Sequence, residues 1–173
     1  MKILIVYATR NGTSKRACEI LKEQLDSFAM VDMFDIKDNP PSPKGYDVAV
    51  VGGSIRMAHL SKKLKRYIRN NTSLLSSIKS AAFICCSLTN DFDDYVATEI
   101  PAKAFFSLGT ECFGGELKTD KTHGIDKIFV YFMRQSILTQ DPDKSESDMI
   151  ELPELFPDTI NALAQRIRRE IVF

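Results

Sequence analysis

The stretch that decides the fold is KILIVYATRNGTS, from Lys2 to Ser14. Its first half, Lys2 to Ala8, is a short apolar run rich in β-branched residues, which predicts a buried strand. The polar turn Thr9 to Gly12 ends that run. From Thr13 onward apolar residues recur at helical spacing, and charged residues fill the other face. The chain therefore begins with a strand, a tight loop and an amphipathic helix.

The same order of strand, loop and helix recurs along the rest of the chain. Further strands are predicted at Met30–Ile36, Tyr46–Val51, Ala81–Cys86 and Glu111–Leu117. In the first of these, apolar and acidic residues alternate, as in a strand near the edge of a sheet. The second is apolar enough to be buried on both faces. Helices are predicted around Leu60 to Ile68, from Phe92 to about Leu108 with an interruption at Pro101, and after Pro157. The pattern predicts one α/β domain, residues 1–173, with a doubly wound five-stranded parallel sheet and helices on both faces.

Composition narrows the class of protein. The 173 residues carry 23 lysines and arginines against 23 aspartates and glutamates, and this zero net charge argues against a dedicated nucleic-acid binder. No apolar run approaches the roughly 18 residues that cross a bilayer, and the N-terminus lacks a signal-peptide pattern, so a cytoplasmic location is expected. The four cysteines show no C-x-x-C spacing, which favours reduced thiols over a zinc or iron–sulfur site.

Three loops are candidates for ligand binding, because ligands of open parallel sheets bind beyond the carboxyl ends of the strands. They are Thr9–Ser14, Gly53–His59 and Ser87–Phe92. The first combines three hydroxyls, an amide and a glycine before a helix start, which predicts a phosphate site. The alternative is a simple helix cap by Asn11 or Thr13. The loop is neither a Walker A motif nor G-x-G-x-x-G, so nucleoside triphosphates and nicotinamide dinucleotides lose support.

These motifs resemble those of the flavodoxin family. The segment ILIVYATRNGTS is similar to the flavodoxin phosphate loop, T/S-x-T-G-x-T/S, with Thr9, Asn11, Gly12 and Ser14 on the matching positions. Within that family, the T-R-[DN]-G turn and the G-x-S-I-R segment followed by a histidine, here Gly52 to His59, resemble the menaquinone-dependent protoporphyrinogen oxidase branch. The resemblance extends from Met1 to about Met133.

The resemblance implies non-covalently bound flavin mononucleotide (FMN). Its phosphate would lie in the first loop, made of Thr9, Arg10, Asn11, Gly12, Thr13 and Ser14. Its ring would lie between two walls, one of Ser54, Ile55, Arg56 and Met57 and the other of Ser87, Leu88, Thr89 and Asn90. Flavodoxins commonly stack Trp and Tyr on the ring, yet this chain has no Trp. The nearest aromatic candidates are Phe92 and Tyr95, and Met57 or Ile55 are the apolar replacements.

Two further segments bear on partners. From Val48 to Asn90 there is no acidic residue, while seven lysines and arginines occur there. They form either a solvated helix face or a basic surface that attracts an acidic partner, an anionic membrane or porphyrin propionates. The apolar segment Gly124 to Leu138 matches a long insertion that the resemblance implies after the fifth strand. It is expected as a buried helix, as a strand misread as a helix, or as a peripheral contact with a membrane or partner.

Three functions follow from these observations. The first is an FMN-binding flavodoxin-like oxidoreductase or electron-transfer protein, whose partner is a redox protein or a small-molecule or quinone acceptor. The second is a menaquinone-dependent protoporphyrinogen oxidase-type dehydrogenase of haem biosynthesis. The third is a flavin-free interaction module that keeps the fold. No side chain is assigned an acid, base or metal-binding role, and either cysteine of the Cys85–Cys86 pair is expected to pack rather than react.

Overall fold

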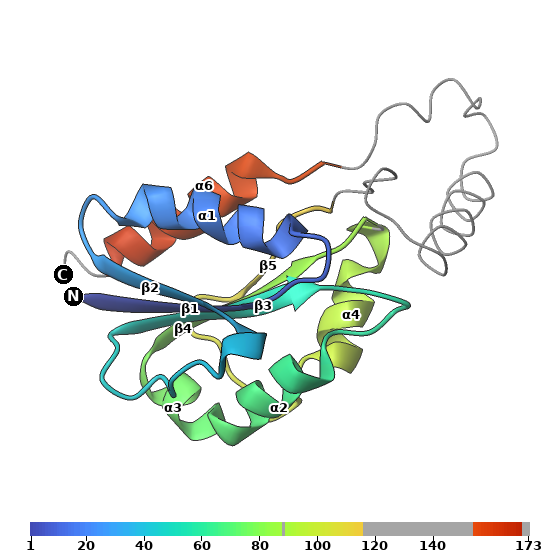
Figure 1. The fold of residues 1–173 in the computed structure, drawn as a ribbon, viewed down its shortest axis with the longest axis horizontal. Coiled ribbons are helices and arrows are strands. Elements are labelled where there is room, and N and C mark those ends of the chain that lie inside the picture. The colour runs from blue at the N-terminus through green and yellow to red at the C-terminus, as the bar shows by residue number, and fades with distance from the viewer. Residues whose placement is uncertain (88, 116–153, 171–173) are drawn as a thin grey trace.

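The sheet of this protein is entirely parallel. The computed structural model describes residues 1–87, 89–115 and 154–170. In it, five strands pair in the order β2-β1-β3-β4-β5 (Figure 1). The strands are β1 (Lys2–Ala8), β2 (Met30–Asp35), β3 (Val48–Ser54), β4 (Lys79–Cys85) and β5 (Thr110–Cys112). The order reverses direction between β1 and β3, so the predicted doubly wound sheet is confirmed.

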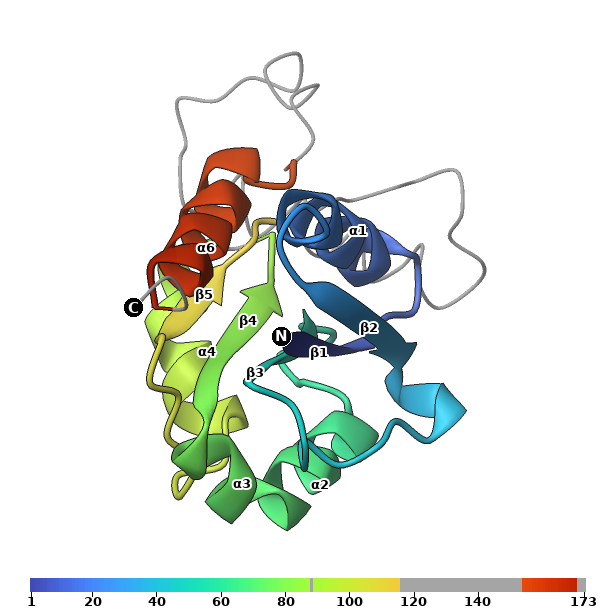
Figure 2. The same cartoon turned by 90° about the vertical axis from the view of Figure 1, so that its left-hand side faces the viewer.

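Helices cover both faces of the sheet. On one face lie α1 (Thr13–Leu25) and α6 (Pro157–Arg169), and on the other lie α2 (Lys62–Asn70), α3 (Thr72–Ser77) and α4 (Phe92–Glu99) (Figure 2). The alternation of β1 divides the core accordingly. Ile3 and Ile5 pack in the cluster under α1 and α6, whereas Leu4 and Val6 pack in the cluster under α2. Both faces of β1 are therefore buried, as its continuous apolar run predicts.

The third strand differs from its prediction. It starts at Val48 rather than Tyr46, and it continues past the predicted end at Val51 through Gly52 and Gly53 to Ser54. A Cβ at Gly52 would lie 2.1 Å from the carbonyl oxygen of Phe83 on β4, and one at Gly53 would lie 2.7 Å from that of Ala8 on β1. These glycines are needed because the neighbouring backbones approach closely, not because the chain turns.

Other helices and strands also end at different residues from those predicted. Helix α4 ends at Glu99 rather than Leu108, because Ile100 precedes Pro101 and takes an extended conformation. Strand β5 covers only Thr110–Cys112, and the remainder of the predicted strand at residues 116–117 lies outside the described residues. A break at Asn71 separates α2 from α3. The predicted last helix is confirmed as α6, with Pro157 in its first turn.

The three candidate loops leave the sheet at the same edge. Ala8 at the end of β1 is paired with Gly53 of β3, and Ser54 is paired with Cys85 of β4. Because parallel strands end on one side, the loops after β1, β3 and β4 converge on the right-hand edge in Figure 1. The fold thus brings together the segments from which the sequence predicts a ligand site.

Candidate functional site

The first loop is shaped by Gly12. This residue is the N-cap of α1 and has a φ of 90°, a left-handed conformation that favours glycine. Its N–H donates to Thr9 Oγ1 at 3.0 Å, and its carbonyl accepts from the N–H of Arg16 at 2.9 Å. Among the described residues no side chain caps α1, so the alternative of a cap by Asn11 or Thr13 is wrong. The first turn of α1 therefore presents its N–H groups to the loop rather than to a capping side chain.

The hydroxyls of this loop divide between the interior and the surface. Thr13 and Ser14 are buried, and Ser14 Oγ lies 2.6 Å from Ser54 Oγ at the end of β3. Thr9 is half-buried, whereas Arg10 and Asn11 are exposed. The Ser14–Ser54 hydrogen bond ties the first candidate loop to the second and fixes their separation.

A cation that the sequence reasoning missed lies beside the first loop. Lys37 Nζ donates to the backbone carbonyl of Thr9 at 2.9 Å and lies 3.7 Å from Asp35 Oδ2. Lys37 follows β2, the strand that neighbours β1 in the sheet. The sequence could have indicated Lys37, because it follows a strand that ends at the same edge of the sheet as the first loop. Lys37 places a positive charge next to the candidate phosphate site.

The second loop is a tight hairpin. Arg56 and His59 exchange two backbone hydrogen bonds of 2.9 Å, and Met57 and Ala58 between them have φ values of 48° and 64°. Two central residues with positive φ are typical of a type I′ turn, in which residues other than Gly, Asn and Asp are uncommon. Met57 is 57% exposed at the tip of this turn. The chain thus holds an apolar side chain in solvent on a strained, well-defined backbone.

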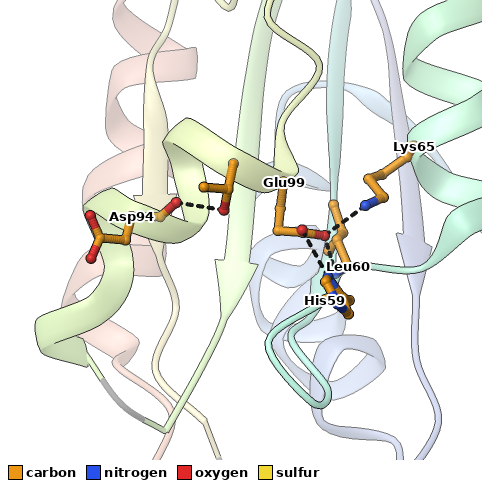
Figure 3. Close-up of polar contacts among 6 residues, drawn as sticks. His59, Leu60, Lys65, Asp94 and Glu99 are labelled. Atoms are coloured by element: carbon orange, nitrogen blue, oxygen red, sulfur yellow. Dashed lines mark hydrogen bonds and ion pairs between the residues drawn. The ribbon is translucent and has the colours of Figure 1, made fainter.

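A buried carboxylate anchors this hairpin. Glu99 of α4 accepts hydrogen bonds from His59 Nδ1 at 3.0 Å, the Leu60 N–H at 2.7 Å and Lys65 Nζ at 2.8 Å (Figure 3). Burial alone would raise the pKa of Glu99, but the bonds from Lys65, His59 and Leu60 outweigh it and lower the pKa. The ionised carboxylate therefore joins α4, α2 and the second loop. No local sequence pattern indicates this contact, because the partners of Glu99 lie 34 to 40 residues away from it in the chain.

The third loop begins at a crowded point. A Cβ at Gly115 would lie 2.7 Å from the carbonyl carbon of Cys86 and 2.8 Å from the nitrogen of Ser87, so the chain after β5 packs directly on this loop. Ser87 is half-buried and Thr89 and Asn90 are exposed, while Leu88 lies outside the described residues.

The four apolar candidates for a contact with the flavin ring differ in their exposure to solvent. Ile55, Phe92 and Tyr95 all pack against the core cluster under α2 and α4, and burial raises the pKa of Tyr95. Met57 is the large exposed apolar side chain among the described residues of the three loops. Of the replacements for a stacking Trp, Met57 therefore fits best.

The chemistry of these residues suits FMN. The first loop offers helix-terminal N–H groups, the hydroxyl of Thr9 and a neighbouring ammonium to a phosphate, and a Cβ at Gly12 would meet no described atom within 4 Å. The second loop offers the exposed thioether of Met57 to a planar ring. The segment Gly124–Leu138 lies outside the described residues, and in the described part of the chain no helix is long and apolar enough to cross a membrane.

Curated relatives share part of their length with this chain. It is 27% identical over 142 residues to protoporphyrinogen IX dehydrogenase (quinone) of Leishmania major, covering 76% of this chain and 62% of that protein. It is also 27% identical over 85 residues to the protein of that name from Escherichia coli strain K12, covering 48% of this chain and 47% of that protein. The chain thus spans about half to three fifths of these relatives.

Solved structures share the fold. A short-chain flavodoxin associated with a non-canonical PDU bacterial microcompartment has a TM-score of 0.53 at 13% identity, with 98% of both chains covered. Oxidised flavodoxin 1 from Bacillus cereus has a TM-score of 0.50 at 14% identity, over 84% of this chain and all of that one. These likenesses confirm the predicted flavodoxin-like architecture.

The family is established by a separate comparison. The model of a flavodoxin domain family, Flavodoxin_5, matches residues 4–145, which include the three candidate loops and all of the described strands except the first two residues of β1. This match supports the predicted cofactor, FMN, and the resemblance drawn from the Thr9–Gly12 and Gly52–His59 motifs. Because it extends over most of the chain, the protein belongs to the flavodoxin domain family.

Proposed function

We propose that this protein binds FMN at the edge formed by the three loops and passes electrons between a donor and an acceptor. The observation that carries the proposal is the Ser14–Ser54 hydrogen bond of 2.6 Å, which joins an uncapped helix start to the hairpin that exposes Met57. One loop suits a phosphate and the other suits a ring. FMN supplies the redox chemistry, and the protein supplies binding and orientation.

The first loop binds the phosphate. The N–H groups of the first turn of α1 carry the positive end of the helix dipole, and the Lys37 ammonium adds a full charge nearby. Gly12 keeps the backbone open to a bulky anion because it has no side chain. The residues assigned to this role are Thr9, Arg10, Asn11, Gly12, Thr13 and Ser14.

The second and third loops enclose the ring. Met57 contacts one face of the flavin ring. The tight turn fixes the backbone of Met57, and this keeps its thioether beside the ring. Glu99 maintains this turn through His59 and Leu60. Backbone groups of Ser54 to Arg56 and of Ser87 to Asn90 meet the ring edge and adjust its redox potential.

A second candidate function is quinone-dependent oxidation of protoporphyrinogen. Two observations favour it: the relatives at 27% identity carry that name, and four exposed cations lie on α2 next to the hairpin. These are Lys62, Lys63, Arg66 and Arg69. A cationic surface beside the ring suits an acidic redox protein or the propionates of a porphyrin. A flavin-free interaction module is the remaining alternative.

The phosphate assignment is tested by titrating the full chain with FMN and with riboflavin, which lacks the phosphate. Thr13→Glu places a negative charge in the loop, and we expect it to weaken FMN binding at least tenfold more than riboflavin binding. Thr159→Glu in the first turn of α6 is the control and should change neither affinity. If neither flavin binds the unmodified protein, the flavin-free alternative holds. Equal losses for both flavins in Thr13→Glu would place the phosphate elsewhere.

The ring assignment is tested by two glycine substitutions in one turn. Met57→Gly and Ala58→Gly both relieve a positive φ, so each should stabilise the flavin-free protein by about 1 kcal/mol. Only Met57→Gly removes the thioether, and we expect it alone to weaken FMN binding, by about fivefold. Equal FMN affinities in the two variants would contradict the contact.

The second function is tested with FMN-loaded protein under anaerobic conditions. If the protein is a protoporphyrinogen dehydrogenase, protoporphyrinogen reduces the bound flavin and a menaquinone analogue reoxidises it, as flavin absorption reports. If protoporphyrinogen leaves the flavin oxidised, that function is wrong and the general electron-transfer function remains.

A further inference from the structure

Two cysteines meet at the ends of neighbouring strands, outside the residues assigned to FMN. Cys86 directly follows β4, and Cys112 is the last residue of β5, paired with Ile84. Their sulfur atoms lie 3.7 Å apart. Both side chains belong to the cluster on the face of the sheet that α4 covers. The parallel pairing of β4 and β5 thus joins two thiols that are 26 residues apart in sequence.

The two thiols differ in environment. Cys86 is 4% exposed, whereas Cys112 is partly exposed. The hydrogen bond from Cys86 lowers the pKa of Cys112 to about 7, helped by the Gly114 N–H and opposed by burial and by Glu111. That same hydrogen bond, together with burial and nearby Asp91, raises the pKa of Cys86. Cys112 is therefore the accessible thiolate, and Cys86 is the buried thiol that donates to it.

The two sulfurs are near neighbours on one face of the sheet, since Cys112 pairs with Ile84 and Cys86 lies two residues further along the chain from Ile84. A disulfide needs a separation of about 2.05 Å, so the sulfurs must approach by about 1.7 Å to form one. All four cysteines are thiols in this structure. The side chains of Cys18 and Cys85 are buried in the cluster on the opposite face of the sheet, under α1 and α6.

We propose that Cys112 and Cys86 form a two-cysteine site for thiol–disulfide exchange with low-molecular-weight disulfides such as oxidised glutathione. The Cys112 thiolate attacks one sulfur of the disulfide, which forms a mixed disulfide and releases one thiolate. Cys86 then loses its proton to that thiolate or to water and attacks Cys112 Sγ. The Cys86–Cys112 disulfide forms, and the second thiol leaves. The two cysteines are oxidised by two electrons, and the small disulfide is reduced to two thiols.

The lowered pKa gives Cys112 a larger share of thiolate at pH 7 than a cysteine at the ordinary value of 9.0 has. The lower basicity offsets part of this gain, because the nucleophilicity of a thiolate falls with its pKa. Since Cys112 is also the more exposed thiol of the pair, we expect it to be the one that attacks the small disulfide.

The test uses the full chain without added FMN, so its outcome is independent of the proposed function. The reduced protein is incubated with oxidised glutathione and followed by intact mass and by mapping of non-reduced peptides. We expect loss of two hydrogens and a Cys86–Cys112 cross-link. Cys86→Ser should accumulate one glutathionyl group on Cys112 because the resolving thiol is missing. Cys112→Ser should lose both products.

The double variant Cys18→Ala/Cys85→Ala is the matched control, since it removes the other buried cysteines and should still form the cross-link. Circular dichroism of each variant verifies folding, and the peptide map of the unmodified protein needs no variant. A protein that keeps four thiols, a cross-link between Cys18 and Cys85, or a Cys86→Ser variant without a trapped adduct would overturn the proposal.

Discussion

Substituting Glu99 by glutamine tests how the candidate site is held together. Glutamine keeps the shape of the side chain and one acceptor oxygen but removes the charge. The carboxylate of Glu99 is 6% exposed and accepts from Lys65, whose side chain is 22% exposed, and from the Leu60 N–H. Hydrogen bonds to a charged group contribute about 1.5 to 3 kcal/mol each, and Lys65 can partly recover hydration. We expect Glu99→Gln to lower the free energy of unfolding by about 2 to 3 kcal/mol at pH 7.

The pH dependence identifies the cause. The pKa of Glu99 is lowered in the folded state from its ordinary value of 4.5, so its contribution is fully present above that value. The contribution is lost as the pH falls through the lowered pKa, because folded Glu99 then takes up a proton. The stability gap between the natural protein and Glu99→Gln should therefore be constant from pH 7 to about pH 5.5 and shrink as the pH falls below 4.5.

The measurement is urea unfolding of flavin-free protein across this pH range, followed by circular dichroism. Glu19→Gln is the control, since Glu19 forms an exposed i,i+4 pair with Lys15 at 3.6 Å and should change stability by less than about 0.5 kcal/mol. A gap at pH 7 no larger than that of Glu19→Gln would refute the anchoring role. A gap that stays the same at low pH would refute its electrostatic origin.

Four shorter predictions concern backbone and charge. Gly52→Ala should cost more than about 3 kcal/mol in unfolding free energy or prevent folding, because its Cβ would lie 2.1 Å from the Phe83 carbonyl oxygen. Gly45→Ala, at a φ of 84° with no described atom within 4 Å of the Cβ, should cost only about 1 kcal/mol in the same assay. Gly12→Ala should have a similar cost in stability and also weaken FMN binding in titrations. Lys37→Met should weaken binding of FMN but not of riboflavin, by about threefold at low salt and less at high salt.

Sequence reasoning succeeded where the deciding information is local. The strand Lys2–Ala8 and the helix start at Thr13 are correct to the residue, because an apolar run is bounded by a polar turn. The predicted third strand stops at Val51 and so leaves out Gly52 and Gly53. Their requirement comes from Phe83 and Ala8 on neighbouring strands, which no local pattern contains. The same limit hid Glu99 and Lys37, whose partners are set by the sheet order.

Cys86 shows the same limit in a different form. Its position in a buried strand predicted simple packing, and its burial agrees with that. The structure adds a neighbour, Cys112. The parallel pairing of β4 and β5 brings Cys112 Sγ to 3.7 Å from Cys86 Sγ. Spacing motifs such as C-x-x-C describe cysteines that meet within one turn of chain, so they cannot report a pair that meets across a sheet.

The acid-free segment Val48–Asn90 also changes meaning once the fold is known. In the described part of the chain, Lys65 pairs with Glu99, and Lys79 pairs with Glu170 at 2.5 Å, and both glutamates lie outside the segment. The exposed basic residues of α2 cover a smaller region than the whole segment Val48–Asn90. Helix α2 follows closely after the hairpin that carries Met57. Glu99 thus has two effects, since it fixes the hairpin and removes Lys65 from the exposed charge. An acidic partner that approaches α2 would therefore be guided toward the exposed thioether rather than over the whole basic segment.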